Sequence, residues 1–388
     1  MSSTRILSRL QEGETPPLID VDFLPLPAPM KGPLPEFSFG KAELLSETGF
    51  STVKKAKLAG HMVAVKEMSI HSLELEKFPN DKSRRQFLEN EVRMHDWLFR
   101  HTDYVVPLLG YYWNENRDTL TLVTKYKPAG SLCDVVNKSK KIPSWPDRLN
   151  LLHEVAHGVE IFHELGIAHG DLKPDNILIS YDYNGWTGCT DYRISFCDFA
   201  AGNKKGPFGT VDYASPEYLE FYQLASLPDP REGDIHALCL ILVAIINWGS
   251  PWNEVNIENT IMKNLGDEEE VKMPDENTMA KMRGILVAND ILDGVRPEIP
   301  AEILRYLPEM VAMLQAGWHQ NPAKRPSARA FCEVFDKAMP EEKRFHLPEK
   351  EPRRCPLSLQ NLFGWFWPAR ARRETMPMQA LPSAATLR

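Results

Sequence analysis

One octapeptide, residues 169–176 with the sequence His-Gly-Asp-Leu-Lys-Pro-Asp-Asn, brings together the residue types that phosphoryl transfer needs. Asp171 can accept or orient a hydroxyl proton, Lys173 can neutralise a moving phosphate, and Asn176 can offer an amide oxygen to a magnesium ion. The apolar residues 177–179 predict a short buried strand, which would place the polar side chains on a loop that leads into a rigid element. The other interpretation is a polar turn without chemistry.

The octapeptide resembles the catalytic loop of eukaryotic protein kinases of the Ser/Thr type, in which a lysine follows the catalytic aspartate by two positions. Three further segments resemble motifs of that family and stand in its order: Val-Ala-Val-Lys at 63–66, Asp-Phe-Ala at 198–200 and Gly-Thr-Val-Asp-Tyr-Ala-Ser-Pro-Glu at 209–217. The resemblance covers about residues 40–338. It implies an α+β, bilobal fold, with ATP and Mg2+ as cofactors and protein substrates phosphorylated on Ser or Thr.

The resemblance also assigns a lysine–glutamate pair in the smaller lobe. Lys66 is the lysine that holds the α- and β-phosphates in this family. Its expected partner is Glu91, on a helix predicted over residues 81–99. Glu89 is the alternative, because the register of that helix is itself a prediction.

Further residues around the catalytic loop receive roles by resemblance. Asp171 is the base or hydroxyl-orienting group, Lys173 acts on phosphate, and Thr210 is expected to hydrogen-bond both of them. Asn176 and Asp198 are the expected magnesium ligands. The order of these motifs therefore predicts one composite catalytic site.

Three residues have implied structural roles in the larger lobe. Glu217 is expected to pair with a buried arginine far along the chain, Arg325, and thereby to stabilise the geometry of the lobe. Asp234 is expected to brace the backbone of the catalytic loop, and as an acid at the start of a helix it also suits a capping role.

The nucleotide site is where the sequence departs most from the family pattern. In the glycine-rich loop, aligned with residues 46–53, only one of the expected glycines remains, and it is offset by one position. Glycines there let backbone amides approach phosphates closely, so their loss predicts weaker nucleotide binding or a different closure of the loop. The residues expected to contact ATP are Leu45, Gly49, Phe50, Val53, Ala64, Lys66, Thr124, Lys125, Tyr126 and Lys127.

Two substitutions beside the catalytic residues bear on regulation. Gly170 replaces the arginine that in the family pairs with a phosphate on the activation segment, and the segment 198–217 is short. Both features predict a kinase that is not switched on by such a phosphorylation. Ala200 replaces a glycine, which would make an inward–outward flip of Asp198 harder.

Composition divides the chain into four regions. Residues 1–36 form a Pro-rich extension that we predict to be extended, poorly packed and flexible. Residues 37–125 form the predicted N-lobe and residues 126–340 the predicted C-lobe. Residues 341–388 form a basic and aromatic tail, for which contact with a membrane surface or a partner is less favoured than docking on the body of the protein.

Within the lobes, apolar periodicity predicts the individual elements. A run of 14 residues, 235–248, is apolar all round and predicts a buried central helix, because about 20 residues are needed to cross a bilayer. The remaining elements are strands at 42–45, 52–58, 62–66, 105–110 and 120–124, and a helix at 146–165.

Overall composition excludes some classes of function. The chain has 388 residues, and its net charge of -8 argues against nucleic acid as a partner. Six cysteines lack metal-binding spacing and are expected to be reduced thiols. Together with the lack of a secretory signal or a transmembrane segment, they predict a cytoplasmic, or alternatively nuclear, location.

Two other functions remain open from sequence. The reduced glycine loop and Ala200 suit a pseudokinase, a binding module with a kinase fold. Residues 169–171, His-Gly-Asp, also occur in aminoglycoside and choline kinases, which phosphorylate small molecules. Those relatives generally lack Lys173 and the segment 210–217, so protein substrates are favoured.

Overall fold

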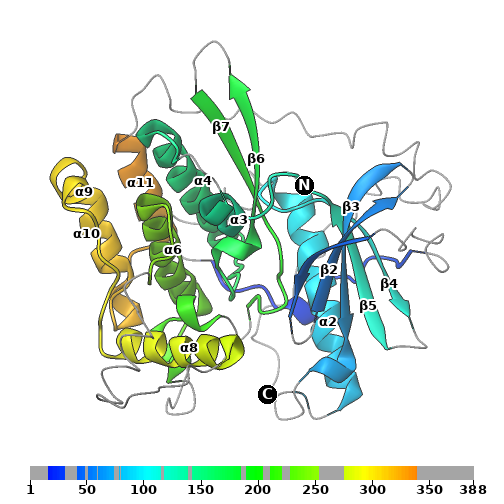
Figure 1. The fold of residues 1–388 in the computed structure, drawn as a ribbon. Coiled ribbons are helices and arrows are strands. Elements are labelled where there is room, and N and C mark those ends of the chain that lie inside the picture. Colours follow the sequence, from blue (N-terminus) through cyan, green and yellow to red (C-terminus); the bar gives the residue numbers. More distant parts are fainter. Residues whose placement is uncertain are drawn as a thin grey trace, which may run out of the picture.

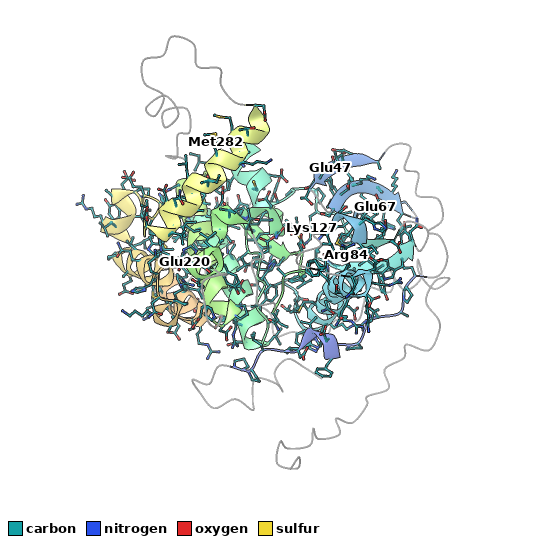
Figure 2. All side chains as sticks on the ribbon, turned by 90° about the horizontal axis from the view of Figure 1, so that it is seen from below. Glu47, Glu67, Arg84, Lys127, Glu220 and Met282 are labelled. Atoms are coloured by element: carbon teal, nitrogen blue, oxygen red, sulfur yellow. The ribbon has the colours of Figure 1, made fainter. Side chains whose placement is uncertain are left out.

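The computed structural model describes residues 16–30, 42–48, 51–58, 60–73, 78, 80–114, 118–138, 142–184, 189–203, 210–220, 228–252 and 275–338. These residues form two lobes, one built on a sheet and one on helices (Figure 1). In Figure 2 the labelled Glu47, Glu67 and Arg84 lie in the sheet lobe, Glu220 and Met282 lie in the helical lobe, and Lys127 lies between them. The predicted bilobal α+β fold is therefore confirmed.

The sheet lobe holds a five-stranded antiparallel sheet with strand order β1-β2-β3-β5-β4. Helix α2 begins at a capping box, in which the Asn80 side chain accepts from the Ser83 backbone amide, and it packs Phe87, Leu88 and Val92 against the sheet. The elements are β1 Glu43–Glu47, β2 Ser51–Leu58, β3 His61–Ser69, η3 Ile70–Ser72, α2 Asp81–His101, β4 Leu108–Asn114 and β5 Thr119–Lys125.

The helical lobe is built around α6 (Pro230–Asn247), whose residues are nearly all buried. The predicted central helix is thus confirmed, although it begins five residues earlier, where Asp229 caps it. Among the described residues no helix is long and apolar enough to span a bilayer. The other elements are α3 Leu132–Lys138, α4 Trp145–Glu164, η4 Pro174–Asn176, β6 Ile177–Asn184, β7 Cys189–Phe196, η5 Val211–Tyr213, α5 Pro216–Leu219, α8 Glu276–Leu292, α9 Ala301–Tyr306, α10 Pro308–Gly317, η7 Pro322–Lys324 and α11 Ala328–Ala338.

The strand predicted over residues 105–110 is wrong in its first part, because β4 begins only at Leu108. Val105 instead forms an isolated parallel bridge with Phe196, and the Val106 amide donates to the Phe196 carbonyl at 3.0 Å. These residues therefore tie the end of β7, in the helical lobe, to the connection between α2 and β4, in the sheet lobe. The described Cys133, Cys197, Cys239 and Cys332 are free thiols.

The Pro-rich extension is not poorly packed where it is described. Residues 16–30, which we call the strap, contain the short η1 (Val21–Phe23) and run from the helical lobe to the sheet lobe (Figures 1 and 2). Val21 and Leu24 are each only 8% exposed and belong to the main core. The prediction was wrong here because proline content describes the backbone, whereas the intervening apolar side chains decide where the segment packs.

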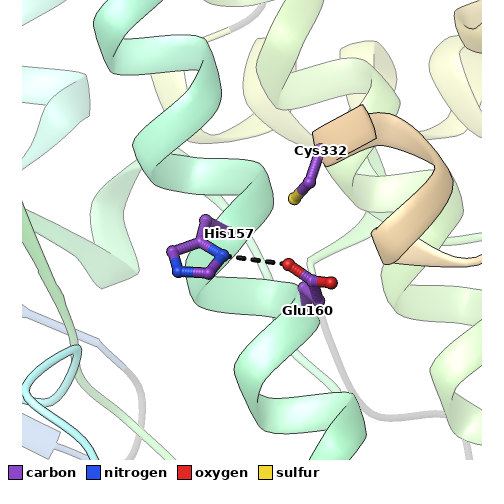
Figure 3. A group of neighbouring side chains, drawn as sticks. All are labelled: His157, Glu160 and Cys332. Carbon is purple, nitrogen blue, oxygen red and sulfur yellow. Dashed lines mark hydrogen bonds and ion pairs between the residues drawn. The ribbon is translucent and has the colours of Figure 1, made fainter. Parts of the chain in front are cut away.

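A polar contact joins α4 to α11 on the side of the helical lobe (Figure 3). His157 Nδ1 lies 2.9 Å from Glu160, and Arg329 Nε donates to the other Glu160 oxygen at 3.2 Å. Cys332 faces the same carboxylate, and the ligand-type atoms of the three residues drawn lie within 4.8 Å of one another. Because both Glu160 oxygens already have partners, we interpret this group as a helix–helix contact.

Candidate active site

Asp234, near the start of α6, holds the backbone of the catalytic loop. Its two carboxylate oxygens accept hydrogen bonds from the amides of His169, at 2.7 Å, and Gly170, at 2.9 Å. His163 also contacts Asp234 through Nε2, at 3.1 Å. The predicted bracing role is confirmed, and it fixes the backbone immediately before Asp171.

Three side chains meet at the predicted catalytic aspartate. Lys173 Nζ lies 3.0 Å from Asp171 Oδ2 and donates to Thr210 Oγ1 at 2.7 Å. The Thr210 hydroxyl in turn donates to Asp171 Oδ1 at 3.2 Å. Although burial opposes its charge, the carboxylate of Asp171 raises the pKa of Lys173. The expected Asp171–Lys173–Thr210 network is present, and Lys173 is a cation there at neutral pH.

The second charged group joins the two lobes. Lys66 Nζ, on β3, lies 2.9 Å from Glu91 Oε1 on α2 and 2.9 Å from Asp198 Oδ1. Burial disfavours the ammonium, but Asp198 and Glu91 outweigh it and raise the pKa of Lys66. Glu91 is therefore the partner of Lys66, whereas the alternative, Glu89, pairs with Arg85 at 3.4 Å.

The backbone at Asp198 directs its carboxylate toward Lys66. Asp198 has φ 66°, in the left-handed region that non-glycine residues rarely adopt. The next residue, Phe199, is 1% exposed, and its ring packs 5.1 Å from that of His169 and 5.4 Å from that of His95. Because the Phe199 side chain is buried on one side of the backbone, the Asp198 carboxylate points to the opposite side, toward Lys66. Despite its own burial, Lys66 and Lys173 lower the pKa of Asp198, which keeps it an anion.

The predicted magnesium ligands, Asn176 and Asp198, carry donor atoms that suit Mg2+. Asn176 Nδ2 donates to the Asp171 carbonyl at 2.8 Å and to Asp171 Oδ2 at 3.2 Å, so its amide oxygen is the atom directed away from Asp171. Asp198 adds a carboxylate. Carboxylate and amide oxygens are the donors that Mg2+ prefers, with water and phosphate oxygens completing the set.

The residues expected to contact ATP lie mainly on the sheet. Ala64 on β3 stands opposite Thr124 on β5, and Val53 on β2 stands opposite Lys66. Leu45 lies on β1, whose residues are all exposed. The other expected contacts follow or end β5, where the Lys125 amide donates to the Pro107 carbonyl at 3.0 Å and Tyr126 and Lys127 come next.

The reduced glycine loop is described only at its two ends. Thr48 and Ser51 close the turn, since the Ser51 amide donates to Thr48 Oγ1 at 3.1 Å and the Thr48 amide donates to the Ser51 carbonyl at 2.8 Å. Gly49 and Phe50, both expected to contact ATP, lie outside the described residues. A backbone hydrogen bond and a hydroxyl contact therefore stabilise the ends of a loop in which the family uses glycines.

The predicted structural pair of the helical lobe is also in place. Arg325 donates to both oxygens of Glu217, at 2.6 and 2.7 Å, and its Nη1 donates to the Glu232 carbonyl at 2.7 Å. The Arg325 side chain has no exposed surface and Glu217 is 5% exposed. This bidentate pair connects α5, at the end of the activation segment, to η7, as expected.

Sequence reasoning missed one residue that contacts the backbone directly before the catalytic loop. Asn203, five residues after Asp198, accepts from the Ala168 amide through Oδ1 at 2.6 Å, and its own amide donates to the Ala168 carbonyl at 3.1 Å. It has φ 55°, a conformation that asparagine tolerates better than most residues. The Gly-Asn pair at 202–203 is a turn signal, but it does not show which backbone the side chain binds.

Comparison with known proteins points to one family. The family model described as protein kinase domain matches residues 39–335. Receptor-interacting serine/threonine-protein kinase 2 of Bos taurus is 29% identical over 304 residues, 76% of this chain and 50% of that protein. Receptor-interacting serine/threonine-protein kinase 4 of Mus musculus is 26% identical over 259 residues, 64% of this chain and 28% of that protein. Probable serine/threonine-protein kinase roco5 of Dictyostelium discoideum is 24% identical over 292 residues, 74% of this chain and 9% of that protein.

The chain spans half or less of the length of these relatives. The matched region contains both charged networks, the buried Glu217–Arg325 pair and the brace from Asp234. On the extent of the match and the agreement in fold, the chain belongs to the protein kinase family.

Proposed function

We propose that the protein is an ATP- and magnesium-dependent protein kinase that phosphorylates Ser and Thr hydroxyls of protein substrates. One observation carries the proposal: Lys66, Glu91 and Asp198 form one contiguous charged group, and Asp171, Lys173 and Thr210 form another. Phosphoryl transfer depends mainly on positioning and on neutralising charge, and these two groups supply both.

In the proposed reaction, the acceptor oxygen forms a bond to the γ-phosphorus of ATP while the bond to the β–γ bridging oxygen breaks and ADP leaves. Asp171 orients the acceptor hydroxyl and takes its proton, and Lys173 offsets negative charge on the transferred group. Lys66, held by Glu91, binds the non-transferred phosphates. Magnesium, when bound at Asn176 and Asp198, would supply further charge neutralisation.

The acceptor side of the site supports a protein substrate. Asp171 and Thr210 line a pocket together with Tyr213 and Ala214 of the activation segment. Trp252 Nε1 donates to the Asp212 carbonyl at 2.8 Å and so holds this part of the segment against the helical lobe. An ordered surface beside Asp171 is what an extended peptide would need in order to present a hydroxyl there.

The test uses a matched pair of substitutions within the catalytic loop. Asp171→Asn should lower kcat by about a thousandfold, because the base is lost while the loop keeps its shape. Asp175→Asn, the same chemical change at an exposed position four residues away, should leave kcat near that of the wild type. The assay is transfer from γ-labelled ATP with magnesium to a generic basic protein, followed by identification of the labelled amino acid.

The outcomes separate the rival functions. Label on Ser or Thr that disappears only in Asp171→Asn supports the proposal. A wild-type protein that transfers nothing but melts at a higher temperature with ATP would indicate a pseudokinase or an enzyme acting on small molecules. Equal activity in both variants would contradict the role of Asp171.

A further inference from the structure

The strap binds the helical lobe beside the catalytic loop. The Ile19 amide donates to the Gly166 carbonyl at 2.9 Å, and Arg231 Nη1 on α6 donates to the Pro16 carbonyl at 2.6 Å. Asn203 Nδ2 donates to the Ile19 carbonyl at 2.7 Å and to the Gly166 carbonyl at 3.1 Å. Asn203 therefore joins three segments: the strap, the residues before the catalytic loop and the start of the activation segment.

The middle of the strap binds helix α2 next to the residue that pairs with Lys66. Asn90 Nδ2 donates to Asp22 Oδ1 at 2.8 Å, and Asn90 directly precedes Glu91. Arg93, three residues further along α2, donates to the Leu24 carbonyl. Leu24 itself is buried in the same core as Met94 and Leu98 of α2. The polar contacts of Asn90 and Arg93 and the apolar contacts of Leu24 thus hold the part of α2 that carries Glu91.

The end of the strap is anchored to the outer strand of the sheet. The Tyr111 hydroxyl donates to the Pro27 carbonyl at 2.7 Å, and the Met30 amide donates to the Tyr111 carbonyl at 2.8 Å. A Cβ at Gly110 would meet Met30 Sδ at 2.5 Å, so the glycine makes room for this contact. The strap is therefore bound at both ends and crosses between the lobes.

At Gly170 the catalytic loop packs closely against the start of the activation segment. A Cβ at Gly170 would lie 2.6 Å from the Ala201 carbonyl oxygen. Ala201 is 7% exposed and lies two residues before Asn203. The strap, Asn203 and the loop that carries Asp171 consequently form one packed block, to which α2 is attached through Asp22 and Leu24.

We propose that the strap is a built-in clamp that holds α2 in its active position, and that Asn203 and Leu24 are positioning residues for phosphoryl transfer. The inference rests on the proposed kinase activity. The Lys66–Glu91–Asp198 contact exists only while α2 stays beside the helical lobe, and the strap is bound to both. Weakening the strap would lower the population of this assembled state, and the turnover number would fall in proportion.

The first test compares two neighbouring residues of the strap in the full chain. Leu24 is 8% exposed and Phe23 is 86% exposed. Leu24→Asp should lower kcat by roughly tenfold while KM for ATP changes by less than about threefold, because the residues that line the nucleotide site on the sheet are untouched. Phe23→Asp, the same introduced charge one residue away, should behave as the wild type. Leu24→Met should retain activity.

The second test asks whether Asn203 acts through the same clamp. Asn203→Gly keeps the left-handed backbone and removes the side-chain bonds, and Asn203→Asp keeps the acceptor for the Ala168 amide but places an oxygen against the Ile19 and Gly166 carbonyls. Each should lower kcat. Combined with Leu24→Asp, the loss should be smaller than the product of the single losses, since one clamp is released only once. If the double variant lost kcat by the full product of the two single losses, the idea of a shared clamp would be contradicted.

A third measurement does not depend on activity. Hydrogen exchange of the α2 amides should be faster in Leu24→Asp than in Phe23→Asp or the wild type, well below the melting temperature. Unchanged α2 exchange and unchanged kcat, with only a lower melting temperature, would overturn the inference and leave the strap a purely stabilising segment. A wild type without phosphoryl transfer would refute the proposed function instead, and the exchange result would still decide whether the strap holds α2.

Discussion

At the scale of single residues, Gly170 shows how one position combines two constraints. Its φ is 78°, in the left-handed region, and the Ala201 carbonyl leaves no room for a Cβ. From the sequence, Gly170 is notable only because it replaces the arginine that the family has at this position. The structure adds that any side chain here would separate the catalytic loop from the activation segment.

Gly170→Ala should therefore cost more than backbone strain alone. Gly60 has a similar φ of 86° with nothing within 4 Å of its missing Cβ, so Gly60→Ala measures the strain by itself, about 1 kcal/mol. Gly170→Ala should lower the free energy of unfolding by about 2 kcal/mol more, the usual cost of overpacking. Urea denaturation of both variants gives the comparison, and equal losses would show that Ala201 moves aside freely.

At the scale of elements, helix α2 is the part whose position matters most for the site. It carries Glu91, and Nε2 of its buried His95 lies 2.7 Å from the Val106 carbonyl, in the connection between α2 and β4. Burial, assisted by the charge of Lys66, lowers the pKa of His95 to about 4, although Val106, Asp96 and Asp198 act in the opposite direction. The histidine is thus neutral wherever α2 is docked.

This burial predicts acid sensitivity in a defined window. The unfolded chain protonates His95 near pH 6.5, whereas the folded chain does so only near pH 4, so stability falls as the pH drops through that window. The contribution of His95 should reach at most about 3 kcal/mol. His95→Gln should flatten the pH dependence of the melting temperature, while His61→Gln, at an exposed position, should not. If the melting temperatures of His95→Gln and the wild type changed with pH in parallel, His95 would not be the cause of the acid sensitivity.

At the scale of the whole molecule, contacts between distant segments decide how the motifs meet. Glu217 and Arg325 are 108 positions apart and form a buried bidentate pair. Removing one partner of such a pair leaves a buried charge without compensation. The end of the activation segment is therefore held by a residue of the helical lobe that lies far along the chain.

Arg325→Met should lower the free energy of unfolding by about 3–5 kcal/mol. Arg100→Met, which breaks the solvent-exposed pair with Asp96, should cost less than about 1 kcal/mol. Combining Arg325→Met with Glu217→Gln should restore part of the loss, because neither member of the pair is then charged. A double variant as unstable as the sum of the two singles would contradict this account.

The sequence by itself predicted the order of the motifs and the two lobes, and the resemblance that the motifs carry implied the kinase fold and the roles of the catalytic-loop residues. The motifs and the elements can be predicted because they are local: the spacing of Asp171, Lys173 and Asn176 defines the motif, and the all-round apolarity of residues 235–248 predicts a buried helix. The pairing of Glu217 with Arg325 was also predicted correctly, but only through resemblance to the family.

Only the tertiary structure decided which residues meet across the chain. It selected Glu91 over Glu89, because a shift of two residues on a helix turns a side chain to another face. It also placed the Pro-rich strap on α2 and brought Asn203 to the catalytic loop. Such contacts depend on where two surfaces meet after folding, and composition or periodicity within one segment carries no record of the other surface.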